Sequence, residues 1–156
     1  METLVYATDP KAVLKVFFRL LKPGASLVLF EYAHFSPKDA SESSKLFKQV
    51  NEYAAMPANT EFEENTLSSM VEEAGFTNIK TSDLSENVKP MLRLFFVLAY
   101  VPYLVIRLFG LEKYFVNAVS AIVAYRYFDM HRYVVIRASK PETKEGHPLE
   151  PKKVQK

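Results

Sequence analysis

The sequence predicts an α/β fold, in which helices pack against a sheet. The first observation is a helical pattern over residues 10–21 that leads through a Pro-Gly turn into an apolar run over residues 25–30. The second is the same order of helix and strand between residues 66 and 83, and the third is a final apolar run over residues 132–138. At 156 residues, the chain has room for one domain with a substantial core.

The first helix has a clear start and a clear stop. Asp9 predicts the start, because an Asx side chain accepts N–H groups of the first turn and Pro10 suits the first helical position. Pro23 and Gly24 predict the stop. The following run lacks polar alternation, which is typical of a strand covered on both faces. We therefore expect residues 26–31 to form a central parallel strand.

The segment from Asp9 to Glu31 resembles a region of class I S-adenosylmethionine-dependent methyltransferases. The similarity lies in Asp-Pro at 9–10, FRLLKPG at 18–24 and LVLFE at 27–31. In that family, this segment is the helix before the fifth strand and the strand itself. The resemblance implies a partial Rossmann-like class I methyltransferase sheet made of the C-terminal strands, with the earlier strands upstream of this sequence.

Residues 1–7, METLVYA, are similar to the segment after the fourth strand in sterol C-methyltransferases and related fungal small-molecule methyltransferases. The resemblance implies methyl transfer from S-adenosylmethionine to a small lipophilic acceptor, such as a sterol. It places Glu2, Thr3 and Tyr6 at the cofactor and makes Glu2 a candidate catalytic residue, although a carboxylate near a chain start is more often solvated. Tyr6 stands where the family pattern has histidine.

The part of the family that holds most of the cofactor has no counterpart in this sequence. A Gly-rich loop after the first strand and an acidic residue after the second belong to the upstream half. The four glycines lie far apart and build no such loop, at Gly24, Gly75, Gly110 and Gly146. We therefore expect the isolated chain not to bind S-adenosylmethionine usefully, and a catalytically inactive, truncated or regulatory product is the alternative function.

His34 follows the first strand, at the edge where open α/β sheets bind their ligands. Imidazole titrates near neutral pH, so His34 is a candidate general base, against the alternative of a surface histidine. The other histidines, His131 and His147, are scattered, and there is no cysteine. We expect no metal site and no disulfide.

The middle of the chain predicts a helix over residues 41–55, a second helix capped by Thr66, and a strand from Thr77 to Asp83. Gly75 suits the position after the second helix. The final strand, over residues 132–138, is expected to be antiparallel at the end of the sheet. An open sheet edge would favour a homo- or hetero-oligomer.

Residues 88–128 are unusually apolar and predict a helical lid insertion. The plainest interpretation is a buried helix pair over residues 90–109 and 112–125, hinged near Gly110. The second is a lid that lines a substrate pocket with Phe95, Tyr100 and Tyr103. The third is peripheral membrane contact by residues 91–109. A spanning helix is disfavoured, because the uninterrupted run is shorter than about 20 residues and contains Pro102.

The amino-acid composition indicates which kinds of partner and which compartment to expect. The formal net charge is only +2, which argues against nucleic-acid binding. The first residues lack the pattern of a secretory signal, so we expect a cytoplasmic protein, with membrane association left open. Residues 1–139 are assigned to the methyltransferase-like domain. Residues 140–156 lack periodicity and are expected to be a disordered tail.

Overall fold

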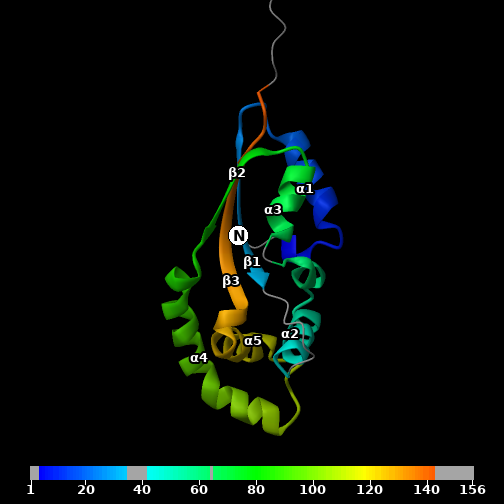
Figure 1. Ribbon diagram of the computed structural model, residues 1–156. Coiled ribbons are helices and arrows are strands. Elements are labelled where there is room, and N and C mark those ends of the chain that lie inside the picture. The colour runs from blue at the N-terminus through cyan, green and yellow to red at the C-terminus, as the bar shows by residue number, and fades with distance from the viewer. Residues whose placement is uncertain (1–3, 35–41, 64, 143–156) are drawn as a thin grey trace, which may run out of the picture.

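The computed structural model describes residues 4–34, 42–63 and 65–142 (Figure 1). The expected tail lies outside these residues from position 143 onward. The elements are, in order, η1 (Leu4–Tyr6), α1 (Pro10–Leu20), β1 (Ser26–His34), α2 (Glu42–Tyr53), η2 (Pro57–Glu61), α3 (Thr66–Glu73), β2 (Thr77–Asp83), α4 (Ser85–Leu108), α5 (Val116–Arg126), η3 (Phe128–Met130) and β3 (His131–Ser139).

The three strands form one sheet in the order β1-β3-β2, and β3 is antiparallel to both neighbours. The register pairs Ser26 with Ser139 and His34 with His131. The predicted strands and the antiparallel direction of β3 are therefore confirmed. The predicted places of two strands in the sheet were wrong. In the described sheet, β3 lies in the middle rather than at the end, and β1 lies at the end rather than in the centre.

The burial pattern shows which faces of the strands are covered. In β3, consecutive residues are buried from Val134 to Ile136, as expected for a strand that is covered on both faces. In β1, burial alternates: Leu27 and Leu29 are buried, whereas Val28 between them is 49% exposed. The buried face of β1 is the face that α1 and α3 cover in Figure 1. The expectation that β1 is covered on both faces was thus wrong.

Local signals fix α1 and the turns around it. The Asp9 carboxylate accepts the Ala12 N–H at 2.9 Å, so the predicted cap is confirmed. Gly75 follows α3 with φ +102°, and a Cβ there would lie 3.1 Å from the Phe18 ring. Thr66 does not cap α3 as predicted: it is the first helical residue, and Asn65 precedes it without a side-chain capping bond.

The lower half of the molecule in Figure 1 is helical. α4 and α5 form the predicted helix pair, and Gly110 lies in the connection with φ +65°. A second apolar cluster joins α2, α4 and α5, and its buried members are Val50, Tyr103, Val119, Ile122 and Val123. The pair is buried on its inner side only, since much of α4 faces outward.

Candidate ligand-binding cavity

A cavity of about 290 Å³ lies beyond the ends of β1 and β3, where α2, α4 and α5 meet the sheet. Its wall is largely apolar, with Phe47, Val50, Leu92, Val123 and Phe128 among the lining residues. The polar lining side chains include tyrosines, serines, asparagines, His131 and Arg132, and none of the described lining residues is a carboxylate. This composition suits an uncharged, mostly apolar ligand with a small number of polar groups.

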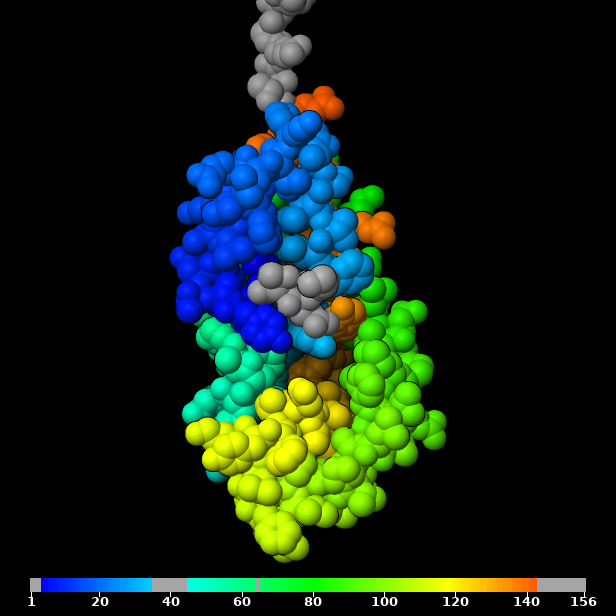
Figure 2. Space-filling model, turned by 180° about the vertical axis from the view of Figure 1, so that it is seen from behind, coloured from blue at the N-terminus to red at the C-terminus, as the bar shows by residue number. Residues whose placement is uncertain are grey.

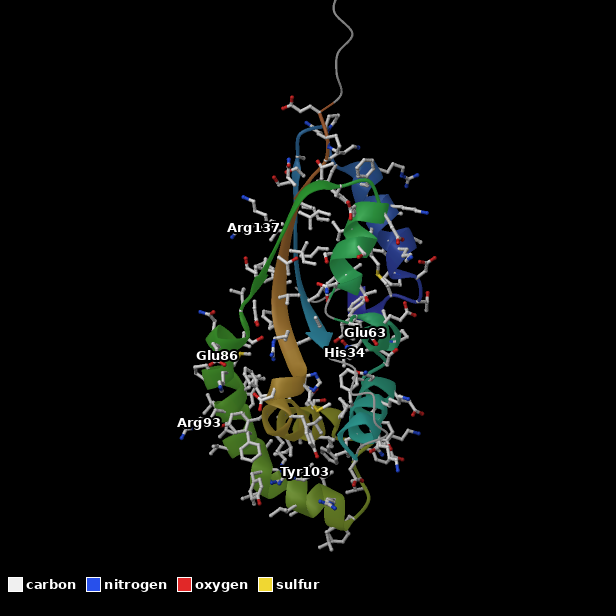
Figure 3. The ribbon with its side chains drawn as sticks, in the orientation of Figure 1. His34, Glu63, Glu86, Arg93, Tyr103 and Arg137 are labelled. Carbon is white, nitrogen blue, oxygen red and sulfur yellow. The ribbon has the colours of Figure 1, made fainter. Side chains whose placement is uncertain are left out.

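Two histidines and a phenylalanine cluster at the strand ends. The ring of Phe47 packs against both His34 and His131 in tilted geometry, with ring centroids 4.9 and 5.0 Å away. Burial lowers the pKa of His131 to about 4, and the nearby His34 adds to the decrease. Burial also lowers the pKa of His34, although the carboxylate of Glu63, beside it in Figure 3, opposes this. Both imidazoles are therefore neutral at pH 7.

An amide pair forms the most distinctive polar feature of the wall. Asn59 Nδ2 donates to Asn51 Oδ1 at 2.8 Å, and the two residues are only 5% and 4% exposed. Asn51 Nδ2 and Asn59 Oδ1 have no hydrogen-bond partner among the described residues. If the oxygen and nitrogen atoms of both amides were exchanged, the pair would still have one free N–H donor and one free oxygen acceptor. One donor and one acceptor of this pair thus lack a partner; both atoms are buried, and both residues line the cavity.

Hydrogen bonds and an ion pair join the first turn of α4 and the residues before it to β3 beside the cavity. The Ser85 hydroxyl donates to Asp83 Oδ1, and the Tyr133 N–H donates to Ser85 Oγ at 2.9 Å. The Leu84 N–H donates to the Tyr133 carbonyl at 2.7 Å. Arg132 pairs with the carboxylate of Asp83 at 3.4 Å. These bonds position α4 and place Ser85 and Tyr133 in the wall.

The structure brings together only some of the predicted site residues. Tyr6 lines the cavity. His34 is 6% exposed and is not among the lining residues, although its ring packs against that of Phe47, which does line the cavity. Glu2 and Thr3 lie outside the described residues. Their roles toward a cofactor or in catalysis stay predictions.

The three aromatic residues expected to line the pocket do not line this cavity. Tyr103 is 8% exposed and packs in the second apolar cluster, pointing inward in Figure 3. Phe95 is 46% exposed and Tyr100 is 38% exposed, so the expectation that they face inward was wrong. Helix α4 is apolar on every side, and periodicity could not indicate which side is buried. Their role toward a substrate remains untested.

The residues that form the polar wall were not predicted from the sequence. His131 was set aside as scattered, yet the strand register places it directly beside His34. Asn51 and Asn59 lie on α2 and η2 and meet through tertiary packing. The available signal was the helix-breaking stretch from Met56 to Asn59, which folds η2 back onto α2.

No protein-family model matches the sequence. Among curated proteins, the S-adenosyl-L-methionine-dependent Diels-Alderase iccD of Talaromyces variabilis is 34% identical over 145 residues, which cover 90% of this chain and 50% of the relative. The S-adenosyl-L-methionine-dependent Diels-Alderase iliD of Neonectria sp. (strain DH2) is 38% identical over 76 residues, which cover 46% of this chain and 31% of the relative. The chain thus spans about half the length of the first relative.

Solved structures give the fold. Haemonchus contortus phosphoethanolamine N-methyltransferase 2, in complex with phosphomonomethylethanolamine and S-adenosylhomocysteine, has a TM-score of 0.62 at 18% identity, covering 90% of this chain and 32% of that one. The [4+2]-cyclase SpnF has a TM-score of 0.64 at 17% identity, covering 92% and 49%. The chain has part of the methyltransferase fold. The predicted fold class is confirmed, whereas similarity to sterol methyltransferases in particular stays a prediction.

The described residues offer little of a cofactor site on their own. Gly24, Gly75 and Gly110 have positive φ, and each lies in a separate turn after a helix. They do not form one loop in which a backbone could cradle a ligand. Beside β1, the η1 segment is held by the Leu4 N–H, which donates to Glu31 Oε1 at 2.8 Å, and it presents Tyr6 to the cavity.

Proposed function

We propose that this chain forms the substrate-facing part of an S-adenosylmethionine-dependent enzyme that acts on a small lipophilic molecule, such as a sterol or a related metabolite. The support is similarity over 90% of the chain to a relative named as such an enzyme, together with the methyltransferase fold. The cavity between α2, α4, α5 and β3 would bind the molecule. The residues shown here would bind and orient it, whereas the cofactor would need groups beyond them.

The reaction that this wall suits best is ring formation by [4+2] cycloaddition. In that reaction, two carbon–carbon σ bonds form, three π bonds become one, and no proton or leaving group departs. It therefore needs no carboxylate and no charged imidazole. This agrees with the neutral His131 and with the described lining residues, none of which is a carboxylate. Both curated relatives carry the name of such a catalyst. The composition of the wall is the observation that carries this proposal.

The chain's own contribution would be positioning and polarisation. Apolar residues from α2, α4 and α5 would hold a flexible polyene in a folded conformation, so that its ends meet. On binding, the Asn51 and Asn59 side chains would turn toward the ligand. The free Asn51 N–H would then donate to a carbonyl conjugated with the reacting alkene, and the free Asn59 oxygen would accept from a neighbouring N–H or O–H. In a cavity that excludes water, such bonds are stronger than in solution.

Methyl transfer is the second candidate, and the fold and His34 favour it. His34 Nδ1 has no hydrogen-bond partner among the described residues, and its neutral imidazole could accept a proton from an acceptor hydroxyl. A base with a lowered pKa is a weak base, and His34 does not line the cavity. Use of His34 would therefore require residues of the cavity wall, such as Phe47, to move.

Product mass separates the two reactions. We would incubate the protein with S-adenosylmethionine and a conjugated polyene that carries a secondary amide, and analyse the mixture by mass spectrometry and polyene absorbance. Cycloaddition gives an isomer of unchanged mass with lost polyene absorbance, whereas methylation adds one CH₂ unit. The Asn51→Leu/Asn59→Leu variant should lose at least about tenfold in probe affinity, because it lacks both free amide groups.

Asn87→Leu is the matched control, because Asn87 is exposed in the first turn of α4 and does not line the cavity. It should bind and convert the probe like the parent protein. Unchanged affinity in the Asn51/Asn59 double variant would remove the cavity from the proposal. A methylated product without any isomer would replace cycloaddition by methyl transfer.

A further inference from the structure

We propose that the outward face of α4 is a membrane-binding surface that docks the protein on an anionic bilayer, with the helix lying in the plane of the interface. This inference concerns where the protein works and is independent of the reaction. The face is defined by residues that recur at helical spacing and are all exposed: Leu94, Val97, Leu98, Val101, Leu104, Val105 and Leu108. Figure 2 shows α4 in green along one flank of the molecule, next to α5 in yellow.

The two sides of α4 differ in what covers them. On the inner side, Tyr103 and Ile106 are buried, and Tyr103 packs against α5. On the outer side, Val101 is 68% exposed and its neighbours along the helix are similarly open. Monomeric soluble proteins rarely expose a continuous apolar face of this length, and such faces mark interaction sites.

The charges beside the apolar face match an anionic lipid surface. Arg93 and Arg107 are exposed, and no acidic residue lies between them in the sequence. They are about four helical turns apart, or about 21 Å, and helical geometry places both along one edge of the apolar face. Arg93 points away from the body of the molecule in Figure 3. Basic side chains along an apolar helical face are typical of helices that lie in the interface of anionic membranes.

The protein contacts of α4 favour docking over spanning. By length and composition, α4 could cross a membrane, a property that it shares with core helices of soluble proteins. Its inner side is bound to α5, so lipid cannot surround it. Pro90 and Pro102 lie inside the helix and lack N–H groups, which leaves carbonyl groups without helical partners. Water and headgroups can satisfy such carbonyls at an interface but not in hydrocarbon.

The same charges disfavour a second copy of the chain as the occupant. Arg93 and Arg107 are equidistant from Tyr100 along the helix. An antiparallel pair of α4 helices centred there would oppose Arg93 of one copy to Arg107 of the other, and a parallel pair would oppose each arginine to itself. Both arrangements place like charges together. A bilayer with anionic headgroups has no such conflict.

The test uses the 156-residue protein and sedimentation with vesicles. We expect binding to vesicles of phosphatidylcholine and phosphatidylserine in equal parts, weaker binding to phosphatidylcholine alone, and release at high salt. Leu98→Glu/Val101→Glu should weaken the binding by at least about tenfold, because it removes buried apolar area from the centre of the face. Arg93→Gln/Arg107→Gln should weaken binding only to the anionic vesicles.

Leu20→Glu is the matched control, because Leu20 is an exposed leucine on α1, and it should bind like the parent protein. All variants are compared by circular dichroism, and the changes on α4 and at Leu20 lie at exposed positions. Asn51→Leu/Asn59→Leu should bind vesicles normally, which separates this inference from the proposed reaction. Unchanged binding of the Leu98/Val101 variant would overturn the inference. Resistance of the bound protein to extraction by alkaline carbonate would also overturn the inference. Self-association through this face that prevents vesicle binding would overturn it as well.

Discussion

At the scale of single residues, the Asn51–Asn59 pair couples stability to ligand binding. Replacing Asn51 alone with leucine leaves the buried amide of Asn59 without its partner. We expect Asn51→Leu to lower the free energy of unfolding by about 1–3 kcal/mol, whereas Asn51→Leu/Asn59→Leu should cost less than the sum of the single changes. Urea denaturation of the two single variants and the double variant measures this coupling. Strictly additive losses would mean that the two amides do not interact.

His131 makes folding stability depend on pH. Its pKa is lowered from 6.5 to about 4 in the folded protein. Above pH 6.5, both states are neutral at this site and stability is complete. As the pH falls from 6.5 toward 4, the unfolded chain binds a proton that the folded protein does not, so stability decreases by up to about 3 kcal/mol. Below about pH 4, both states are protonated and the decrease from this site ends.

The measurement is the urea midpoint between pH 7.5 and 5. The parent protein should lose stability over this range, and His131→Gln should lose less. His34 adds a dependence of the same sign, because burial also lowers its pKa. An identical pH dependence in the parent and the His131→Gln variant would contradict the assignment.

At the scale of elements, two glycines at helix ends should respond differently to the same change. Both have positive φ, where alanine is strained by about 1 kcal/mol. At Gly75, the new Cβ would also lie 3.1 Å from the Phe18 ring, whereas at Gly110 no atom lies within 4 Å. We therefore expect Gly75→Ala to cost about 2–3 kcal/mol and Gly110→Ala about 1 kcal/mol in thermal or urea unfolding. Equal losses would show that Phe18 moves aside freely.

The sequence predicted the elements better than their arrangement. Asp9, Gly75 and Gly110 act on their immediate neighbours, so the corresponding helix ends and hinge could be predicted from adjacent residues. The middle position of β3 depends on pairing between residues far apart in the sequence, such as Ser26 and Ser139, which no local signal encodes.

The candidate site was predicted less well than the fold. Tyr6 lies at the cavity, as an expected ligand contact would, but the amide pair, His131 and Ser85 come together only through packing of separate elements. The outward orientation of Phe95 and Tyr100 could not be predicted, because neither side of α4 carries a polar stripe. Which side of α4 is buried depends on the elements that pack against it, and the sequence of α4 alone does not indicate them.

At the scale of the whole molecule, β1 lies at the end of the described sheet and exposes Val28 on its uncovered face. We propose that the protein self-associates through this edge and face at high concentration. Val28→Glu should reduce that association, because a charged side chain on an edge strand opposes pairing, and its cross-strand neighbour Arg137 would stabilise the new carboxylate.

Sedimentation velocity over a concentration series measures this effect. Val16→Glu on α1 is the control, because Val16 has a similar exposure and lies away from the sheet edge. It should associate like the parent protein. Equal association of both variants with the parent would place the contact elsewhere, and vesicle sedimentation would then show whether α4 is responsible.

The middle position of β3 also governs how the sheet can form during folding. β1 and β2 are not paired with each other, and the ladder bonds that each of them makes in the described sheet are made with β3. Neither strand can therefore join this sheet before β3 reaches it, and the pairing of Ser26 with Ser139 closes a loop that spans most of the described residues. Pairing between residues so far apart in the sequence is typical of slow folding. We infer that the apolar faces of α1 and α3 stay exposed until β3 docks, so that folding intermediates of this protein are prone to aggregate.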